Sequence, residues 1–299
     1  MFGFRPDGKK VKKVAPVFKI IPSIMLERSD SQVFFKQDIP LKSLEEYINK
    51  KAEEGIKFSY MTIIYAAIVR IIADRPQLNW FAMNGTLYER NEINVSLVIK
   101  KSLTDDGEET NIKIPFTGNE TIFEIKEKLE SEINENKKVE AENNMDKFVN
   151  FINLIPNFLV RWLVKFLRFL DKYGLLPKKL IQLSPFHTSA YITNTGSLGI
   201  DSIYHHLYNF GTTSMFFAIG KKKKSYIYED DEIKKEKCIT LAFVGDERIC
   251  DGYYYANSFK QLLRYLKKPE LLEKSRNSES VFQDKETEKD PEQKEKINS

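Results

Sequence analysis

The chain has 299 residues, 41% of them hydrophobic, which is enough for one large domain with a substantial core. Its 47 basic and 43 acidic residues give a net charge of +4, and this near balance argues against a dedicated nucleic-acid binder. The two cysteines, Cys238 and Cys250, provide neither a disulfide framework nor a zinc-binding spacing, so a reducing, cytoplasmic setting is expected.

The ends of the chain differ in composition from its middle. Residues 1–15 are basic, and no apolar segment of a secretory signal follows them. No apolar run reaches the about 18 residues that a membrane-spanning helix needs. We therefore expect a basic N-terminal arm over 1–15 and a folded domain over 16–273. The charged residues 274–299 are expected to form a disordered tail.

The first half of the chain predicts both helices and strands. Residues 17–26 are apolar and expected to be extended, with a break at Pro22, and alternation predicts a strand over 31–41. Helical spacing predicts an amphipathic helix over 41–55, and the apolar run before Pro76 favours a buried helix. The Asn84-Gly85 pair predicts a hairpin, and a strand is expected over 91–101. Thr121 is expected to cap a charged surface helix.

Residues 146–173 form an apolar segment that contains a cationic stripe. Arg161, Lys165, Arg168 and Lys172 follow one another at steps of 4, 3 and 4, which places them on one helical face. Three interpretations stay open: a buried helix with one wet edge, a helix lying in a membrane interface with its cations at the headgroups, or an oligomer contact.

The second half of the chain predicts strands and a terminal helix. SAYIT is expected to be a strand that leads into a turn with glycine, and Lys221 to Lys224 are expected at a hairpin tip. CITLAFV predicts the last strand, followed by a helix that ends near Pro269. The order of elements indicates a mixed α/β fold, and the absence of a glycine-rich phosphate loop argues against a nucleotide P-loop or a dinucleotide-binding fold.

Three polar clusters are candidates for chemistry. The first is the turn ITNTGSLG, the second is the pair His205 and His206, and the third is GDERICDG, Gly245 to Gly252. Adjacent histidines lack the i, i+4 spacing that would bring two imidazoles together on a helix, so no metal site is expected. Each cluster alone is weak evidence.

The order of four segments along the chain is more specific. The segments are FKIIPSIMLERSDSQVFFKQDIPLKSLEEYI, PQLNWFAMNGTLYERNEINVSLVI, YITNTGSLGID and ITLAFVGDERICDGYYYANSFKQLLRYLKKPELL. Together they resemble the catalytic domain of the acyltransferase component of 2-oxo acid dehydrogenase complexes. They also resemble chloramphenicol acetyltransferase, which shares that fold. The resemblance covers roughly residues 16–273. It implies an α/β mixed-sheet sandwich, here with the inserted amphipathic helix 146–173, and a homotrimer.

The resemblance implies acyl transfer between a thioester, such as acyl-CoA, and an acceptor. The family motif is His-x-x-x-Asp-Gly; Asp251 and Gly252 match it as loop anchors, beside Arg248, whereas Glu247 occupies the position of the catalytic His. Thr193 matches the hydroxyl that stabilises the oxyanion. We expect no covalently bound cofactor and no lipoyl domain. The side chains and backbone expected to contact substrate are those of Asn194, Gly196, Ser197, His205 and His206.

Glutamate is a weaker base than histidine, because its ordinary pKa is about 4.3 against about 6.5 for imidazole. General-base catalysis is typically worth about 100- to 10,000-fold, so activity is expected to be impaired or lost. Four alternatives stay open: Glu247 with a pKa raised by burial acts on a different acceptor, His205 or His206 replaces it, Glu247 pairs with Arg248, or the domain no longer catalyses. In the last case the chain would be a non-catalytic scaffold protein, or one peripheral to a membrane through its cationic helix.

Overall fold

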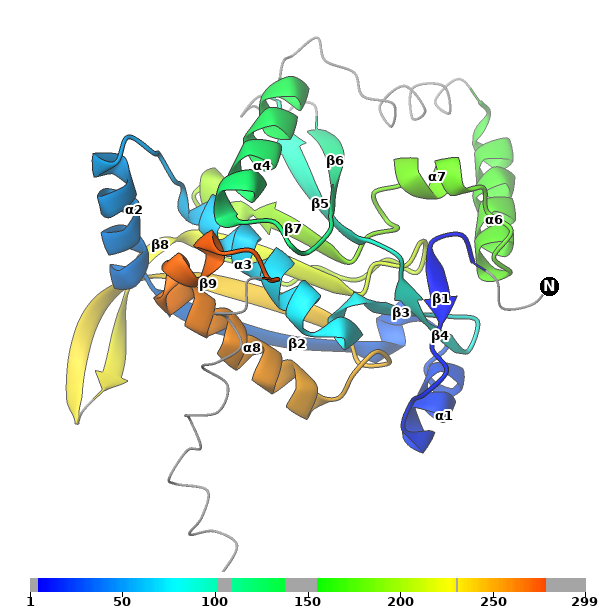
Figure 1. Ribbon diagram of the computed structural model, residues 1–299. Coiled ribbons are helices and arrows are strands. Elements are labelled where there is room, and N and C mark those ends of the chain that lie inside the picture. Colours follow the sequence, from blue (N-terminus) through cyan, green and yellow to red (C-terminus); the bar gives the residue numbers. More distant parts are fainter. Residues whose placement is uncertain (1–4, 102–108, 138–154, 230, 278–299) are drawn as a thin grey trace, which may run out of the picture.

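The computed structural model describes residues 5–101, 109–137, 155–229 and 231–277. The expected tail over 274–299 therefore lies outside the described residues beyond residue 277, as does the first part of the expected helix over 146–173. Figure 1 shows the arrangement of the elements.

A mixed six-stranded sheet forms the centre of the molecule, with the strand order β2-β9-β8-β7-β5-β6. Strand β7 runs parallel to both of its neighbours, and the remaining pairs are antiparallel. The mixed α/β fold is confirmed, as are the strands predicted over 31–41 and 91–101 and those predicted for SAYIT and CITLAFV. The strands are β2 (Gln32–Pro40), β5 (Ile93–Lys100), β6 (Glu109–Phe116), β7 (Ala190–Asn194), β8 (Met215–Glu229) and β9 (Glu232–Asp246).

The prediction for Lys221 to Lys224 is wrong, because these lysines lie within β8 and the chain turns only after Glu229. Strand β2 pairs with β9 only as far as Cys238, so the outer parts of β8 and β9 continue as a two-stranded arm (Figure 1). In this arm exposed Lys222, Lys224 and Tyr226 alternate with half-buried Lys223 and Ser225, a strand periodicity that the run of four lysines conceals.

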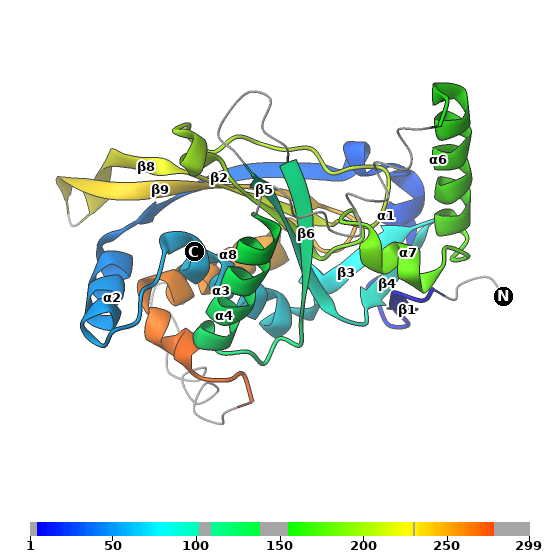
Figure 2. The same cartoon turned by 90° about the horizontal axis from the view of Figure 1, so that it is seen from above.

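Helices cover one face of the sheet, as the view from above shows (Figure 2). They are α2 (Lys42–Glu53), α3 (Tyr60–Asp74), α4 (Ile122–Asn136) and α8 (Gly252–Lys267). Thr121 caps α4 at its N-terminus, and its side chain forms a reciprocal capping box with Glu124, which confirms the predicted cap.

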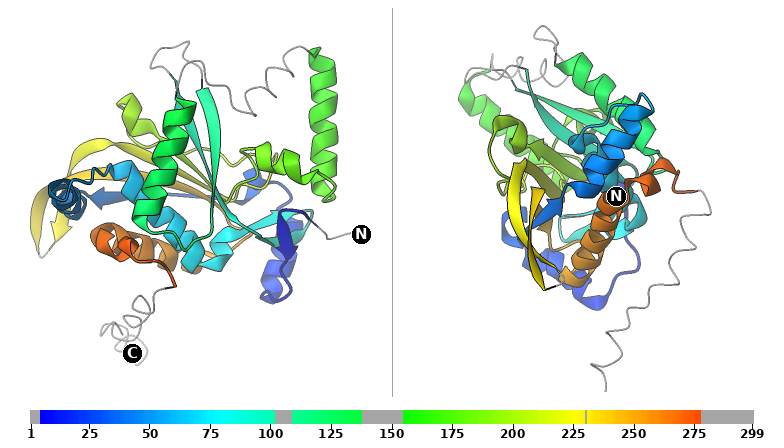
Figure 3. Two further views of the ribbon diagram at one scale, coloured as in Figure 1. Left: turned by 45° about the horizontal axis from the view of Figure 1, so that its top comes forward. Right: turned by 90° about the vertical axis from the view of Figure 1, so that its left-hand side faces the viewer.

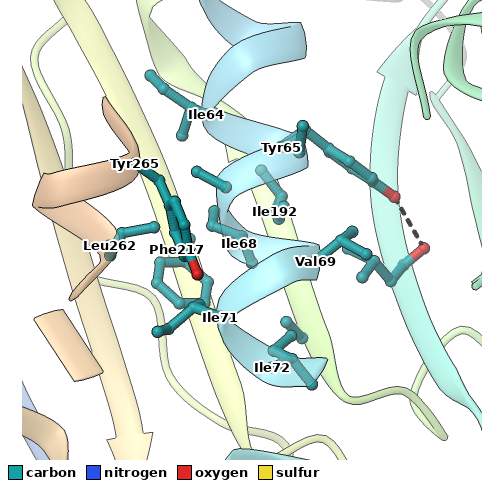
Figure 4. Packing of buried hydrophobic residues seen from close by; sticks show 14 of the residues in the cluster. Ile64, Tyr65, Ile68, Val69, Ile71, Ile72, Ile192, Phe217, Leu262 and Tyr265 are labelled. Carbon is teal, nitrogen blue, oxygen red and sulfur yellow. Dashed lines mark hydrogen bonds between the residues drawn. The ribbon is translucent and has the colours of Figure 1, made fainter. Parts of the chain in front are cut away.

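Helix α3 is the centre of the core. Ser59 caps it, and its side chains from Thr62 to Ala73 are buried, which confirms the predicted buried helix. Figure 4 shows α3 packed between Ile192 and Phe217 of the sheet and Leu262 of α8. The Tyr65 hydroxyl, which is fully buried, donates to the Val95 carbonyl of β5 at 3.3 Å and so satisfies its polar atom within the core.

A small sheet with the order β1-β4-β3 lies beside the main one. Its strands are β1 (Gly8–Lys10), β3 (Trp80–Met83) and β4 (Thr86–Arg90). Asn84 and Gly85 both have positive φ between β3 and β4, which confirms the predicted hairpin. Part of the expected basic arm thus belongs to a sheet, and Arg5 is buried between Asp7 and Asp171.

Three helices lie apart from the layer over the sheet: α1 (Pro16–Ile24), α6 (Asn157–Lys172) and α7 (Lys178–Leu183). The extended conformation expected around Pro22 is wrong. Pro16 begins the α1 helix, where its missing N–H costs nothing, and Pro22 removes only one bond near the end. Helix α6 buries only Asp171, so the interpretation of this segment as a buried helix is also wrong. The left view of Figure 3 shows α6 at the edge of the molecule.

Candidate functional site

The turn after β9 is built on a buried carboxylate. Asp246 is fully buried and accepts hydrogen bonds from Arg248 Nε at 2.8 Å, from Arg248 Nη2 at 2.7 Å and from Ser31 Oγ at 2.9 Å. Arg28 Nε lies 4.0 Å from the same carboxylate, and burial lowers the pKa of Arg28 to about 10. Two arginines therefore converge on one carboxylate and fix the turn to the segment before β2.

Glu247 does not pair with Arg248, and that prediction is wrong. The chain turns after Asp246, where the Ile249 amide donates to the Asp246 carbonyl at 3.2 Å. Within this turn the Arg248 guanidinium and its backbone amide both donate to the Asp246 carboxylate. The Glu247 amide donates to the Ser31 carbonyl at 2.8 Å, and its side chain is half-buried. Within the described chain this carboxylate has no ion-pair or hydrogen-bond partner.

Glu247 instead lines an open groove of about 390 Å³ between β2 and α8. The groove is mostly apolar, with Lys260 at its rim. Strand β2 supplies one wall of the groove and helix α8 the other. The other lining residues are Val33, Phe35, Gln37, Gly252, Tyr255, Ala256, Phe259 and Leu263.

Asp251 and Cys250 complete the motif. Asp251 precedes helix α8, and its Oδ1 accepts a hydrogen bond from the Tyr254 amide at 2.7 Å, so its side chain closes the first turn that begins at Gly252. Cys250 is fully buried, and burial raises the pKa of its thiol well above the usual value. The thiol is therefore protonated at neutral pH and is no nucleophile.

Thr193 lies at the end of β7 and is half-buried. Its hydroxyl has no hydrogen-bond partner among the described residues. The following turn is fixed by its own bonds, since Asn194 Oδ1 accepts from the Ser197 amide and Ser197 Oγ donates to the Asn194 carbonyl at 2.7 Å. A Cβ at Gly196 would lie 2.5 Å from the Gly220 carbonyl oxygen, so glycine is needed where this turn meets β8.

Thr193 and Glu247 are far apart within one chain. Thr193 is opposite Ala218 of β8, which is opposite Ala242 of β9, five residues before Glu247. A rise of about 3.3 Å per residue and a strand spacing of about 4.8 Å put the two residues about 19 Å apart. They also face opposite sides of the sheet, since Thr193 shares the side of Tyr191, whereas the Glu247 groove opens beside α8.

The two histidines lie on the side of Thr193. His205 stacks on Phe216 of β8 with ring centroids 4.3 Å apart, and burial lowers the pKa of His205, so the ring is neutral. His206 is exposed and packs edge-on against Tyr208. Neither histidine is among the residues that line the Glu247 groove of its own chain.

Sequence reasoning missed the residues that hold the turn, namely Asp246, Arg28 and Ser31. Asp246 gave one signal, because a carboxylate two residues after the wholly buried run CITLAFV needs a charged partner. The partners Arg28 and Ser31 lie more than 200 residues earlier, and no local pattern links them to it.

No group of three His, Cys, Asp or Glu side chains gathers where it would hold a metal ion, within the part of the chain that the structure describes. None of the described helices is both long and apolar enough to cross a membrane.

A model of a known protein family matches the later part of the chain. Residues 185–273 match the family model described as 2-oxoacid dehydrogenases acyltransferase (catalytic domain). A comparison with curated protein sequences finds no match.

Several solved structures are similar over most of the chain. A probable dihydrolipoamide acetyltransferase from Listeria monocytogenes is 16% identical with a TM-score of 0.55, and the match covers 87% of this chain and 95% of that one. The dihydrolipoamide acetyltransferase of Azotobacter vinelandii is 13% identical with a TM-score of 0.56, over 88% and 94%. A chloramphenicol acetyltransferase is 10% identical with a TM-score of 0.50, over 87% and 100%. The chain thus has the chloramphenicol acetyltransferase-like fold that is also found in the cores of dihydrolipoamide acetyltransferases.

Proposed function

We propose that the chain is an acyltransferase of this fold that moves an acyl group from an acyl thioester, such as acyl-CoA, to an acceptor. The observation that carries the proposal is the state of Glu247. Its carboxylate faces an open apolar groove, and the neighbouring Arg248 is taken up by Asp246. The carboxylate is therefore available to a ligand, whereas a sealed ion pair would have favoured an inert domain.

The spacing of the motif supports the same assignment. The Azotobacter enzyme was studied for the catalytic roles of a serine, a histidine and an asparagine, the last two of which are four residues apart. Glu247 and Asp251 have the same spacing, and Asp251 caps the helix that follows. We assign Glu247 to the position of the histidine and Thr193, a hydroxyl residue, to that of the serine.

The proposed reaction needs one base and one hydrogen-bond donor. The acceptor X–H attacks the thioester carbonyl carbon, and Glu247 takes its proton. The Thr193 hydroxyl donates a hydrogen bond to the oxyanion of the tetrahedral intermediate. The carbon–sulfur bond then breaks, and the leaving thiolate recovers the proton from Glu247, so acyl–S–CoA and HX become acyl–X and CoA–SH.

A carboxylate base favours an amine as the acceptor. A thiol, with an ordinary pKa of about 8.5, must lose its proton as it attacks, and a Glu with an ordinary pKa of about 4.3 is poorly matched to that step. A neutral amine attacks without prior deprotonation. Its N–H becomes acidic only in the intermediate, where a carboxylate is an adequate base.

The two assigned groups require a second copy of the chain, because they lie about 19 Å apart on opposite sides of one sheet. We propose a homotrimer in which Thr193 of one protomer faces the Glu247 groove of its neighbour. The free edge of β2, with its exposed Phe34, and the projecting arm, with its exposed Tyr226, are surfaces suited to such contacts.

The release of CoA thiol from acetyl-CoA, in the presence of amine or thiol acceptors, tests the chemistry. We expect Thr193→Ala to lower the rate about 100-fold and Glu247→Gln by at least as much, while Glu53→Gln, an exposed carboxylate on α2, has no effect. Glu247→His should shift the preference from amines toward thiols. No release by either the natural chain or Glu247→His would refute the proposal.

Mixing variants tests the shared site. The Thr193→Ala chain and the Glu247→Gln chain are each expected to be nearly inactive alone. Refolding or co-expressing the two together should restore about a quarter of the activity, because a quarter of the randomly assembled interfaces contain both intact residues. Activity that stays at the level of the single variants would place both residues in the same chain and contradict the proposed assembly.

A further inference from the structure

Helix α6 exposes an aromatic face. Four of its ring side chains follow one another at steps of 4, 4 and 3 and therefore lie on one side of the helix. Half-buried Leu163, Leu167 and Leu170 lie on another side of the helix, where Leu167 borders a small cavity together with Leu180 and Phe186. Trp162 stacks on Phe166 at a centroid distance of 5.4 Å. The exposed fractions of the aromatic face are 70% for Phe158, 64% for Trp162, 43% for Phe166 and 54% for Phe169.

The helix is held at its C-terminal end. Asp171 is its one buried residue, with Oδ1 at 2.7 Å from Arg5 Nη2 and Oδ2 at 3.2 Å from His187 Nε2. Burial alone would raise the pKa of Asp171, but His187 and Arg5 hold it well below the usual value, so the carboxylate stays charged. An ionic anchor thus fixes the helix, while its aromatic face contributes little to the folded core.

The exposed charges of α6 are all positive. The exposed cations lie on the arc next to the aromatic face and are Arg161, Lys165, Arg168 and Lys172. The one acidic residue of the helix is the buried Asp171. Large aromatic side chains beside a cationic stripe are the composition of helices that lie in a membrane interface.

Helix α1 adds apolar surface at the same end of the molecule, opposite the β8–β9 arm (Figure 1). Its Ile20 is 58% exposed and its Ile24 is 70% exposed, and its one charged residue is Lys19. Glu27, just after α1, lies 3.7 Å from Arg168, and both helices border a groove of about 430 Å³. Two helices with free apolar side chains therefore share one end of the fold.

We propose that α6, with α1 beside it, binds the chain to an anionic lipid surface. The helix lies in the plane of the interface with its aromatic side chains in the acyl region and its cations at the headgroups. The same face of a second copy is a poor occupant of this surface, since the exposed charges of α6 are all positive and would lie against like charges. This proposal is independent of the acyl transfer proposed above.

The two tryptophans allow a direct test of insertion. Trp80→Phe leaves Trp162 as the sole tryptophan of the full chain. Vesicles of phosphatidylglycerol and phosphatidylcholine in equal parts should shift its emission to the blue, and brominated acyl chains should quench it, because the indole enters about 5–10 Å below the surface. Pure phosphatidylcholine should give a much smaller shift. An emission spectrum that is unchanged by anionic vesicles at low salt would overturn the proposal.

Two variants assign binding to this surface in vesicle sedimentation. Replacing Arg161, Lys165 and Lys172 by Glu should weaken binding about 100-fold or more, since each cation contributes about fivefold. The combination Phe158→Ser and Phe169→Ser should also release the protein, and its exposed positions leave the unfolding temperature unchanged. The matched control replaces the exposed lysines of the α2 region, Lys42, Lys50 and Lys57, by Glu and should bind normally.

Binding lost in both variants and kept in the control supports the proposal. Binding lost equally in the control shows a non-specific effect of net charge and overturns it. A concentration-dependent oligomer that disappears in the aromatic variant, with no vesicle binding by the natural chain, would identify a protein contact and overturn it as well.

Discussion

Asp246→Asn should destabilise the fold strongly, because this substitution removes one charge from a buried cluster of three. The side chain of Asp246 is 0% exposed, and those of Arg28 and Arg248 are each 4% exposed, so water cannot replace the lost partner. The asparagine amide would also set an N–H against a guanidinium donor. Removing one partner of a buried ion pair typically costs about 3–5 kcal/mol, and we expect a loss of that size.

Urea unfolding, followed by circular dichroism with the natural chain and the variant in parallel, measures this loss. For a chain of this size the same loss lowers the unfolding temperature by roughly 10 °C. Ser31→Ala is the matched control, because it removes one hydrogen bond from the same carboxylate and should cost only about 1 kcal/mol. If Asp246→Asn costs no more than this control, the two arginines do not depend on Asp246 and the reasoning is refuted.

Three further predictions concern stability. Thr121→Ala should cost about 1 kcal/mol, because it removes half of the capping box with Glu124, and urea unfolding checks this. Gly196→Ala should lower the free energy of unfolding by about 1–3 kcal/mol, because the new methyl group meets the Gly220 carbonyl. A loss below about 0.5 kcal/mol, which is typical of surface substitutions, would contradict this close approach. Burial lowers the pKa of Lys113 to about 7. Between about pH 7 and 10 the unfolded chain therefore binds more protons than the folded chain, and the free energy of unfolding should rise with pH. Urea midpoints at several pH values should show this rise, and Lys113→Met should reduce it.

Local signals in the sequence predicted most of the elements. The apolar run before Pro76, the Asn84-Gly85 turn and the Thr121 cap each depend on residues close in the chain, and the structure confirms all three. Helix α1 was mistaken for an extended segment because it is short and contains Pro22. The degree to which α6 is buried depends on which surfaces other elements leave open, and no local pattern contains that information.

The candidate site was predictable only in part. The position of Glu247 at a turn after a buried strand follows from its neighbours in the chain. The groove beside it does not, since one wall comes from β2 and the other from α8. The choice of Asp246 over Glu247 as the partner of Arg248 is set by the turn that the chain makes after Asp246, and the sequence does not specify the type of that turn.

The separation of Thr193 from Glu247 across the sheet has a consequence for how the reaction would be controlled. Under the proposed mechanism a correctly folded single protomer is inert, and turnover follows the assembled fraction, which falls on dilution by mass action. Specific activity measured at nanomolar chain concentration would then understate the value reached in a crowded cell.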